Sequence, residues 1–352
     1  MNKKKIYPGI AQLGHLDNNE RNKLLKQASK LRKLAAERGG RKPSLEDVIK
    51  QLSQEPATPL QVPTMRDTAV WIGKKTLRTL QGHEAELNGH RCAVGDEVHI
   101  ADHAGHLRVA AIEPRRTSLG RPDVNNPHLQ QVIVANVDVV VVTVSVATPP
   151  LHPRLIDRYL IAIQAGGAEP LLAVNKLDAL DSDPAALATE LAKLEPYAGL
   201  GLRIMRCSAA TGRGIDELRH ALVGKTCAFV GHSGVGKSSL VNALFPDLGQ
   251  KVGELSSGYG RGAHTTTWSS LFDVGNGTRL IDTPGIRSFG LGRLTITELQ
   301  ASFSEFEPWG CRFRDCTHVH EPGCGVRAAV EVGDVSAVRF ETYRRLMDEV
   351  AR

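Results

Sequence analysis

The sequence has few aromatic residues and no long apolar run. Aromatic side chains make up only 5% of the 352 residues, so its cores must be built mainly from Val, Leu, Ile and Ala. The longest apolar stretch, Val137–Val142, is broken by Asp138 and falls far short of the roughly 18 residues that a membrane-spanning helix needs. No apolar stretch follows the basic start Met1–Lys5, which argues against a secretory signal. We therefore expect a cytoplasmic, reduced protein with no membrane segment.

Positive charge is concentrated near the start of the chain. The net charge is +6, but residues 1–50 hold thirteen Lys or Arg against five acidic residues, which gives +8 there and −2 for the remainder. A basic arm on a nearly neutral body favours a polyanionic partner, most often nucleic acid. The alternative is a solvated tail that binds nothing.

The length predicts two or three domains. Residues 1–62 form a basic N-terminal extension, partly helical or disordered, in which Glu20–Arg38 has helical spacing of Leu and Ala. Residues 63–120 contain short strand candidates separated by turns: Ala69–Gly73, Cys92–Ile100 and Leu107–Ile112. This rhythm is typical of a small β-barrel such as an OB fold.

Residues 130–298 alternate between buried strands and helices. The strand candidates are Val139–Val144, Pro170–Val174, Arg203–Arg206, Thr226–Val230 and Arg279–Ile281. The helix candidates are Arg154–Gln164, Ala185–Leu194, Ile215–Leu222 and Lys237–Phe245. This βαβ alternation predicts an α/β domain with a parallel sheet covered by helices on both faces.

A phosphate-binding loop follows one of these strands. Residues Gly231–Ser238 match the pattern Gly-x4-Gly-Lys-Ser/Thr in full, between an apolar strand and a helix. The loop N–H groups and the helix dipole favour phosphate, Lys237 reaches the β/γ-phosphates and the Ser238 hydroxyl ligates magnesium. The nucleotide contacts expected here are Gly231, His232, Ser233, Gly234, Val235, Gly236, Lys237, Ser238 and Ser239. The strand–loop–helix context argues against a chance Gly-rich turn.

A second segment, Asp282-Thr283-Pro284-Gly285, follows the strand Arg279–Ile281. A carboxylate at a strand end can hold magnesium, so Asp282 is expected to do so through water. Gly285 can offer its N–H to the γ-phosphate and move when that phosphate leaves. Alone such a tetrapeptide is often only a turn, but a phosphate loop elsewhere in the chain strengthens the functional interpretation.

Two segments predict selection of guanine. Asn175-Lys176-Leu177-Asp178 follows a strand, and the Asp178 carboxylate can accept two hydrogen bonds from the guanine N1 and N2 edge, which adenine does not offer. Asn175 can brace the loop, and the Lys176 stem can cover the base. The loop Cys207–Ala210, with Ser208 and Ala209, suits a backbone N–H aimed at the guanine O6. Together with the phosphate loop these segments make an ATPase or a nucleotide kinase a weaker hypothesis.

The order of these segments is unusual, since the guanine segments precede the phosphate loop. Translation-factor GTPases, whose motifs these resemble, have the phosphate loop first. Because such loops sit at strand ends, a circular permutation can preserve the site. In this chain Asp282–Gly285 is followed directly by the C-terminal region. We expect hydrolysis to change hydrogen exchange in residues 300–352.

A Gly-rich segment with threonines, Gly258–Thr267, is expected to be the first switch, with Thr266 closing onto magnesium. Ile286 stands where many GTPases carry a water-orienting Gln, and an apolar side chain cannot hydrogen-bond the attacking water. Intrinsic hydrolysis should therefore be slow. His264 and His232 are candidate catalytic groups, against the alternative that each is an ordinary surface histidine.

Three of the six cysteines gather near the C-terminus with the spacing Cys-x4-Cys-x-His-x5-Cys. Three thiolates and one imidazole complete a closed tetrahedral site, which predicts one structural zinc ion in residues 299–352. The expected ligands are Cys311, Cys316, His318 and Cys324, with His320 as an alternative nitrogen ligand. The separate cysteines are expected to be buried small hydrophobes: Cys92, Cys207 and Cys227.

From about residue 66 to 345 the whole arrangement resembles one family, the circularly permuted ribosome small subunit-dependent GTPase A proteins (RsgA or YjeQ). The resemblance includes the segment Pro153–Leu160 and the switch His264–Thr267. It implies an OB fold, a central GTPase with magnesium and a C-terminal zinc domain. It also implies a monomeric late-assembly factor that binds ribosomal RNA and hydrolyses GTP when the small subunit stimulates it, with hydrolysis coupled to release. The alternative function is an RNA-binding adaptor that switches with GTP and GDP but turns over little.

Overall fold

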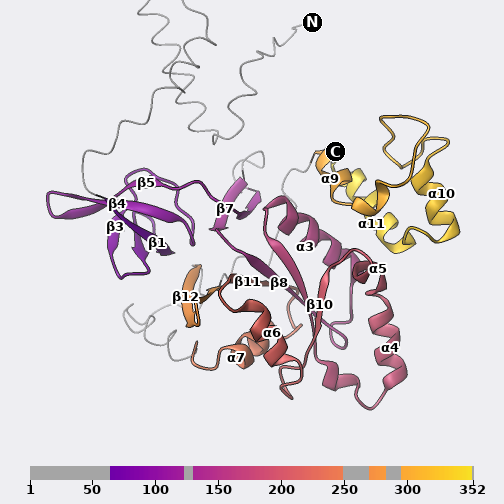
Figure 1. The fold of residues 1–352 in the computed structure, drawn as a ribbon, viewed down its shortest axis with the longest axis horizontal. Coiled ribbons are helices and arrows are strands. Elements are labelled where there is room, and N and C mark those ends of the chain that lie inside the picture. The colour runs from indigo at the N-terminus through magenta and orange to yellow at the C-terminus, as the bar shows by residue number, and fades with distance from the viewer. Residues whose placement is uncertain (1–63, 123–129, 249–268, 283–294, 351–352) are drawn as a thin grey trace, which may run out of the picture. The chain divides into compact units, whose positions relative to one another are not determined.

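The computed structural model describes residues 64–122, 130–248, 269–282 and 295–350 (Figure 1). The chain divides into two compact units, Met1–Thr64 and Met65–Arg352, and the second is described here by itself. The basic arm and the helix expected at Glu20–Arg38 lie outside the described residues. Within the described ranges, no helix has both the length and the apolar character needed to cross a membrane.

Five strands close on themselves in the first part of this unit. They are β1 (Thr64–Ile72), β2 (Thr76–Thr79), β3 (Glu84–Glu86), β4 (Glu97–His103) and β5 (His106–Ile112). Their order is β1-β2-β3-β5-β4, the β3–β5 pair is parallel, and a further β1–β4 pairing closes the ring. Aliphatic side chains form its core: Ala69, Leu77, Ala85, Val98, Ile100 and Val109. This region is therefore a small closed β structure, as the short strand candidates predicted.

Within the candidate Cys92–Ile100, the turn that the Gly95-Asp96 pair indicates is present, and only the residues after it form a strand. Asp96 is fully buried, its carboxylate accepts a hydrogen bond from the Ala93 N–H at 2.7 Å, and Arg115 pairs with it. Gly95 has φ of +92°, which an extended strand does not allow. These residues form a turn, and β4 begins only at Glu97.

The predicted parallel sheet is confirmed. Its strands are β8 (Val139–Ser145), β9 (Glu169–Asn175), β10 (Arg203–Arg206), β11 (Thr226–Val230) and β13 (Thr278–Asp282). They lie in the order β10-β9-β8-β11-β13, and each neighbouring pair is parallel. Every bound falls within one residue of the sequence prediction, because buried parallel strands are read from their continuous apolar runs.

Helices cover both faces of this sheet. They are α3 (Pro153–Ala165), η2 (Leu177–Leu180), α4 (Pro184–Ala192), α5 (Glu195–Ala198), α6 (Ile215–Leu222) and α7 (Lys237–Leu244). Alternate valines of β8 enter two different cores, as the period of two in a strand dictates. Val140 and Val142 pack in the core that holds α3, whereas Val141 packs in the core that holds α6 and α7.

Five of the described strands were not expected from the sequence: β2, β3, β6, β7 and β12. β6 (Ser118–Pro122) and β7 (Gln130–Ala135) form an antiparallel pair between the closed ring and the parallel strands. β12 (Ser270–Gly275) runs antiparallel to β13 and also pairs with β1 through Trp71 and Ser270. In the described part of the chain, β12 thereby joins the closed ring and the parallel strands into one sheet.

The C-terminal part is mostly helical. Its elements are α9 (Ile296–Ala301), η4 (Ser304–Phe306), α10 (Gly325–Val332) and α11 (Ala337–Val350). Thr295 and Glu298 form a reciprocal capping box that starts α9. Aromatic rings form the centre of this part. Phe306 stacks on Phe303 with 5.3 Å between the ring centroids, and it meets Tyr343 edge-on with 5.1 Å between the centroids. Helix α11 packs against α3 of the parallel-sheet region (Figure 1).

Candidate functional site

The predicted nucleotide segments meet at one edge of the parallel sheet. Asn175 ends β9, Ser208 follows β10, Gly231 follows β11 and Asp282 ends β13. Because these strands are parallel neighbours, their carboxyl ends share one edge, which is where ligands bind in open α/β sheets. The sheet therefore brings together segments that are more than 100 residues apart, and their permuted order in the chain does not prevent it.

The phosphate loop requires glycine at its first and last turns. Gly231 has φ of +143°, and a Cβ there would lie 2.2 Å from the Thr143 carbonyl oxygen of β8. Gly236 has φ of +90°, and a Cβ there would lie 2.4 Å from the Asn175 side-chain nitrogen. Any larger residue would therefore push the loop off its neighbouring strands.

Helix α7 begins at the end of this loop. Lys237, its first residue, extends Nζ back over the loop and donates to the carbonyls of Gly231 and His232, both at 2.8 Å. Ser238 and Ser239 lie exposed in the first turn of the helix. The helix N-terminus with its N–H groups and dipole, plus the Lys237 ammonium, gives a positive concave edge suited to phosphate.

Asn175 links the guanine segments to the phosphate loop. Its side chain is 1% exposed, donates to the Val235 carbonyl at 3.1 Å and accepts from the Ala209 N–H at 3.0 Å. The Lys176 side chain also reaches the phosphate loop, where its Nζ donates to the Gly234 carbonyl. The same Nζ donates to the Thr148 carbonyl at 2.7 Å. Hydrogen bonds between protein groups thus hold together the loops that follow β9, β10 and β11.

Asp178 is held in place by Ser208, whose hydroxyl donates to the Asp178 carboxylate. The Thr211 N–H donates to the same hydroxyl at 3.1 Å, so Ser208 has a defined orientation. In the same loop the Ala209 N–H donates to the Asn175 side chain, and the guanine-facing N–H expected in Cys207–Ala210 stays a prediction. The loop therefore braces the site through Ala209.

Several predicted site residues lie outside the described residues: His264, Thr266, Gly285 and Ile286. Of the predicted magnesium ligands, Ser238 and Asp282 are described, and both are exposed at the nucleotide edge. His232 is exposed on the phosphate loop.

A cluster of three cysteines and one histidine lies in the C-terminal part. One ligand atom from each of Cys311, Cys316, His318 and Cys324 falls within 4.8 Å of the others. The Cys311 and Cys324 sulfurs are 3.8 Å apart, and His318 Nδ1 lies 3.4 Å and 3.5 Å from them. The alternative ligand His320 is not part of this cluster. The four residues predicted from spacing are thus brought together in an arrangement that can hold a metal ion.

The surroundings of the cluster favour a thiolate at Cys311. Burial raises the pKa of Cys311, but the backbone N–H groups of Gly325 and Val326, together with the side chains of Cys316 and Cys324, lower it by more, so that the net pKa lies below the ordinary thiol value. Backbone N–H donors to sulfur are the second shell expected around ligating thiolates.

The other cysteines lie away from the cluster. Cys207 and Cys227 are fully buried as expected, whereas Cys92 is only partly buried, which corrects that prediction. Burial raises the pKa of each of the three thiols to about 12, so they are poor nucleophiles.

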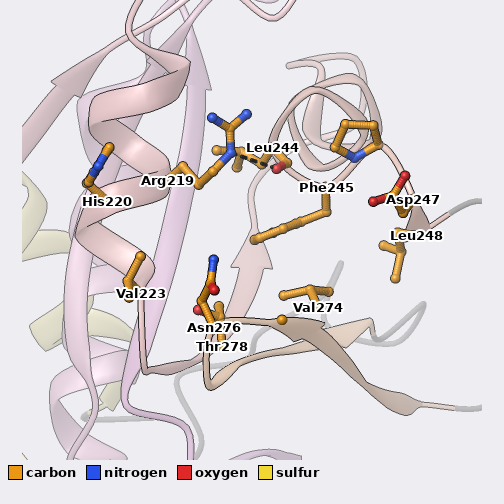
Figure 2. Close-up of a pocket in the computed structure, with 12 residues that line it drawn as sticks. Arg219, His220, Val223, Leu244, Phe245, Asp247, Leu248, Val274, Asn276 and Thr278 are labelled. Carbon is orange, nitrogen blue, oxygen red and sulfur yellow. Dashed lines mark hydrogen bonds between the residues drawn. The ribbon is translucent and has the colours of Figure 1, made fainter.

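Figure 2 shows a cavity of about 260 Å³ at the opposite end of the parallel strands. It lies between α6, the end of α7 and the β12–β13 turn, where Arg219 donates to the Leu244 carbonyl at 3.0 Å. Thr278, which lines it, begins β13, whereas Asp282 ends that strand. The cavity is therefore separate from the nucleotide edge.

Sequence reasoning missed two buried residues that support the site. Tyr159 of α3 is 4% exposed and packs in the core cluster that also holds Val230, the residue before the phosphate loop. Asp157, two residues earlier, pairs with Arg339 of α11 at 2.6 Å. In the sequence, these two residues were indicated only by the segment Pro153–Leu160, which is part of the family resemblance. No pattern of residue spacing pointed to them.

Comparison with known proteins gives consistent matches. The family model described as RsgA GTPase matches residues 112–292. The chain is 41% identical over 282 residues to the small ribosomal subunit biogenesis GTPase RsgA of Chromohalobacter salexigens, covering 76% of this chain and 81% of that protein. It is 45% identical over 245 residues to RsgA 1 of Vibrio vulnificus, covering 69% of this chain and 68% of that protein.

Two solved structures share the fold. The crystal structure of YjeQ from Thermotoga maritima is 32% identical, with a TM-score of 0.66, and the match covers 82% of this chain and 99% of that one. The structure of YloQ, a circularly permuted GTPase, is 24% identical with a TM-score of 0.64 over 84% of this chain and 98% of that one. At that identity the second match shows the fold alone.

Proposed function

Because this chain belongs to the RsgA GTPase family, it is a GTP hydrolase that acts in maturation of the small ribosomal subunit, and we propose that its nucleotide state controls its residence on that subunit. The observation that carries the proposal is the meeting of the guanine and phosphate loops at one sheet edge, fastened by Asn175. In this proposal the small subunit and its ribosomal RNA stimulate hydrolysis to GDP and phosphate, and hydrolysis releases the protein. The protein acts as a cytoplasmic monomer.

Each nucleotide segment has a proposed role. Asp178 binds the N1 and N2 edge of guanine, in the orientation that Ser208 supports. The loop N–H groups from Gly231 to Gly236 and Lys237 bind the phosphates. Gly285 senses the γ-phosphate. His264 and Thr266 are the proposed catalytic residues.

The nucleotide edge also fits magnesium. Oxygen ligands suit this ion, and the Ser238 hydroxyl and Asp282 carboxylate are exposed at neighbouring strand ends, with Thr266 proposed as a third ligand. When bound, magnesium neutralises charge on the β- and γ-phosphates. The protein side chains hold the nucleotide so that its β- and γ-phosphates lie beside the proposed magnesium ligands.

The cysteine cluster fits zinc in particular. With Zn–S bonds of about 2.3 Å and Zn–N bonds of about 2.0 Å, a tetrahedral site has S···S edges of about 3.8 Å and S···N edges of about 3.5 Å. The Cys311–Cys324 separation of 3.8 Å and the His318 separations of 3.4 Å and 3.5 Å have these values. We therefore assign one structural zinc ion to Cys311, Cys316, His318 and Cys324, with the role of fixing the loop that precedes α10.

The closed five-stranded ring is proposed to be an OB fold that contacts RNA. The ring order β1-β2-β3-β5-β4, closed by β1–β4 and with a parallel β3–β5 pair, supports this assignment. The proposed organisation is an N-terminal extension at 1–62, the OB fold at 63–120, the permuted GTPase at 130–298 and the zinc domain at 299–352. The division of the chain after Thr64 supports the first boundary.

Binding to subunits tests the proposed function. Full-length protein is centrifuged with purified small subunits in the presence of a non-hydrolysable GTP analogue or of GDP. We expect several-fold more protein in the pellet with the analogue, and no such difference for Lys237→Ala, because that variant loses a phosphate ligand. Equal pelleting in both nucleotide states, or equal pelleting with large subunits, would contradict the proposal.

A further inference from the structure

The closed five-stranded ring reaches the nucleotide edge through one strand, β12. The pairing of β13 with β11 ends at Ile281. Its pairing with β12 extends one residue further, where Asp282 lies opposite Ser270. On its other side Ser270 is in register with Trp71 of β1. A single residue of β12 therefore lies between the ring and the strand end that carries the Asp282 carboxylate.

A turn of the ring, residues 94–96, makes a second contact at the same place. Val94 packs in the core cluster that holds Ile281, the residue before Asp282. Gly95 lies so near that a Cβ on it would be 3.5 Å from Ile281 Cδ1. Because Ile281 is only 1% exposed, its position depends on the atoms packed around it. The ring thus contacts the partner of Asp282 in β12 and the residue before it in β13.

Hydrogen bonds hold this turn to both β1 and β7. The Gly95 N–H donates to the Ala69 carbonyl of β1 at 2.8 Å. On the other side, a Cβ on Gly95 would lie only 2.1 Å from the Ala135 carbonyl oxygen of β7. The Asn136 side chain donates to the Gly95 carbonyl at 2.9 Å and accepts from the Arg116 N–H at 2.9 Å. Because Asn136 is only 8% exposed, removal of its side chain would leave the Gly95 carbonyl without this donor in a buried place.

We propose that Asn136 is a positioning residue for Asp282. By holding the ring turn against β7, it fixes Ile281 and the paired ends of β12 and β13, and so couples the ring to magnesium-dependent binding of the nucleotide. The inference rests on the proposed function, since it requires GTP at the phosphate loop and magnesium at Asp282. Coupling between two sites is reciprocal. Ribosomal RNA that moves the ring must therefore change the affinity for magnesium and nucleotide, and these ligands must in turn stabilise the placement of the ring.

Asn136→Gly tests the inference in the full-length protein. Asn136 has φ of +56°, which glycine adopts readily, so the variant removes the side-chain hydrogen bonds without straining the backbone. Affinity for a non-hydrolysable GTP analogue is measured by calorimetry, with saturating magnesium and with EDTA. We expect the affinity to fall about threefold to tenfold with magnesium, as the loss of a buried hydrogen bond predicts. With EDTA the affinity should not change, because the phosphate loop is unaltered.

Asn88→Gly is the matched control. Asn88 also has a positive φ, +47°, and lies exposed in the ring between β3 and β4, outside the contacts with β7, β12 and β13 just described. This variant makes the same chemical change and should leave both affinities unchanged. A purely structural role of Asn136 would lower the melting temperature of Asn136→Gly and leave the ratio of the two affinities as it is in the unaltered protein.

Hydrogen exchange tests the coupling in the unaltered protein, without any substitution. The analogue with magnesium should slow amide exchange in β1 and in residues 94–96, relative to the analogue with EDTA. Asn136→Gly should lose most of this difference, whereas Asn88→Gly should keep it. Should Asn136→Gly not fold, the exchange of the unaltered protein decides the matter alone.

The outcomes separate this inference from the proposed function. If the unaltered protein does not bind the analogue, the proposed function fails and the inference fails with it. If magnesium does not strengthen binding, the assignment of magnesium to the nucleotide edge fails, and so does the inference. If magnesium does strengthen binding, an unchanged ratio of affinities in Asn136→Gly overturns only the coupling. Equal exchange of β1 in the unaltered protein, with magnesium and with EDTA, overturns only the coupling as well.

Discussion

Asp178→Asn is expected to lower affinity for GTP by about a hundredfold or more and to make xanthosine triphosphate the better ligand. The carboxylate accepts two hydrogen bonds from guanine, and hydrogen bonds to a charged group contribute about 1.5–3 kcal/mol each. Xanthine carries an oxygen where guanine carries the amino group, so the asparagine amide can donate there and still accept from N1. Competition binding with GTP, xanthosine triphosphate and ATP measures the change.

Asp181→Asn provides the control for this prediction. Asp181 lies three residues further along, is exposed and pairs with Arg213 at 2.9 Å. An exposed pair contributes little to stability, so this variant should keep the affinity and the guanine preference of the unaltered protein. If Asp178→Asn still prefers GTP over xanthosine triphosphate, Asp178 does not select the base. Equal affinity of the unaltered protein for ATP and GTP would also contradict the assignment.

Cys324→Ser is expected to abolish stoichiometric zinc and to loosen the C-terminal part. Zinc contributes about 10–16 kcal/mol to folding in zinc-finger peptides at neutral pH, far more than a single core contact. Serine is informative here because Cys324 is the N-cap of α10 and its sulfur accepts from the Arg327 N–H. Since serine is a good N-cap, the variant removes a metal ligand and retains the cap. Elemental analysis measures the loss of zinc, and hydrogen exchange over residues 295–350 measures the loosening of the C-terminal part.

Cys92→Ser is the control for the zinc prediction. Cys92 lies in the β-rich region, outside the cluster, and is partly buried. Its substitution should leave the zinc content and the exchange of residues 295–350 unchanged. Zinc in Cys324→Ser equal to that of the unaltered protein would refute the ligand assignment. The assignment would also be refuted if the unaltered protein contained no zinc and the amide hydrogens of its C-terminal part still exchanged slowly.

The sequence predicted what is encoded locally. The phosphate loop, the guanine segments and the cysteine spacing each combine residue types with fixed separations, and the structure brings their described members together. The parallel strands were also predictable, because a run such as Val139–Val144 is apolar on both faces. β3 escaped prediction because its three residues contain one buried side chain, Ala85, between two exposed glutamates. β12 has a mixed pattern of burial, and its pairing with β1 is set by tertiary structure.

Long-range contacts could not be predicted from spacing. Asp157 and Arg339 are 182 residues apart, and nothing in either local sequence indicates a buried ion pair. The link from Asn175 to Val235 and Ala209 likewise depends on how three strands are ordered in the sheet.

The most direct test of the central claim is single-turnover GTP hydrolysis with and without purified small ribosomal subunits. Ile286 offers no hydrogen bond to a water, so hydrolysis by the protein alone should be slow. We predict that small subunits accelerate it by about tenfold or more, because groups supplied by a partner commonly complete such sites, and that large subunits do not. An unchanged rate with saturating small subunits would contradict the account and would favour an adaptor that binds GTP with little turnover.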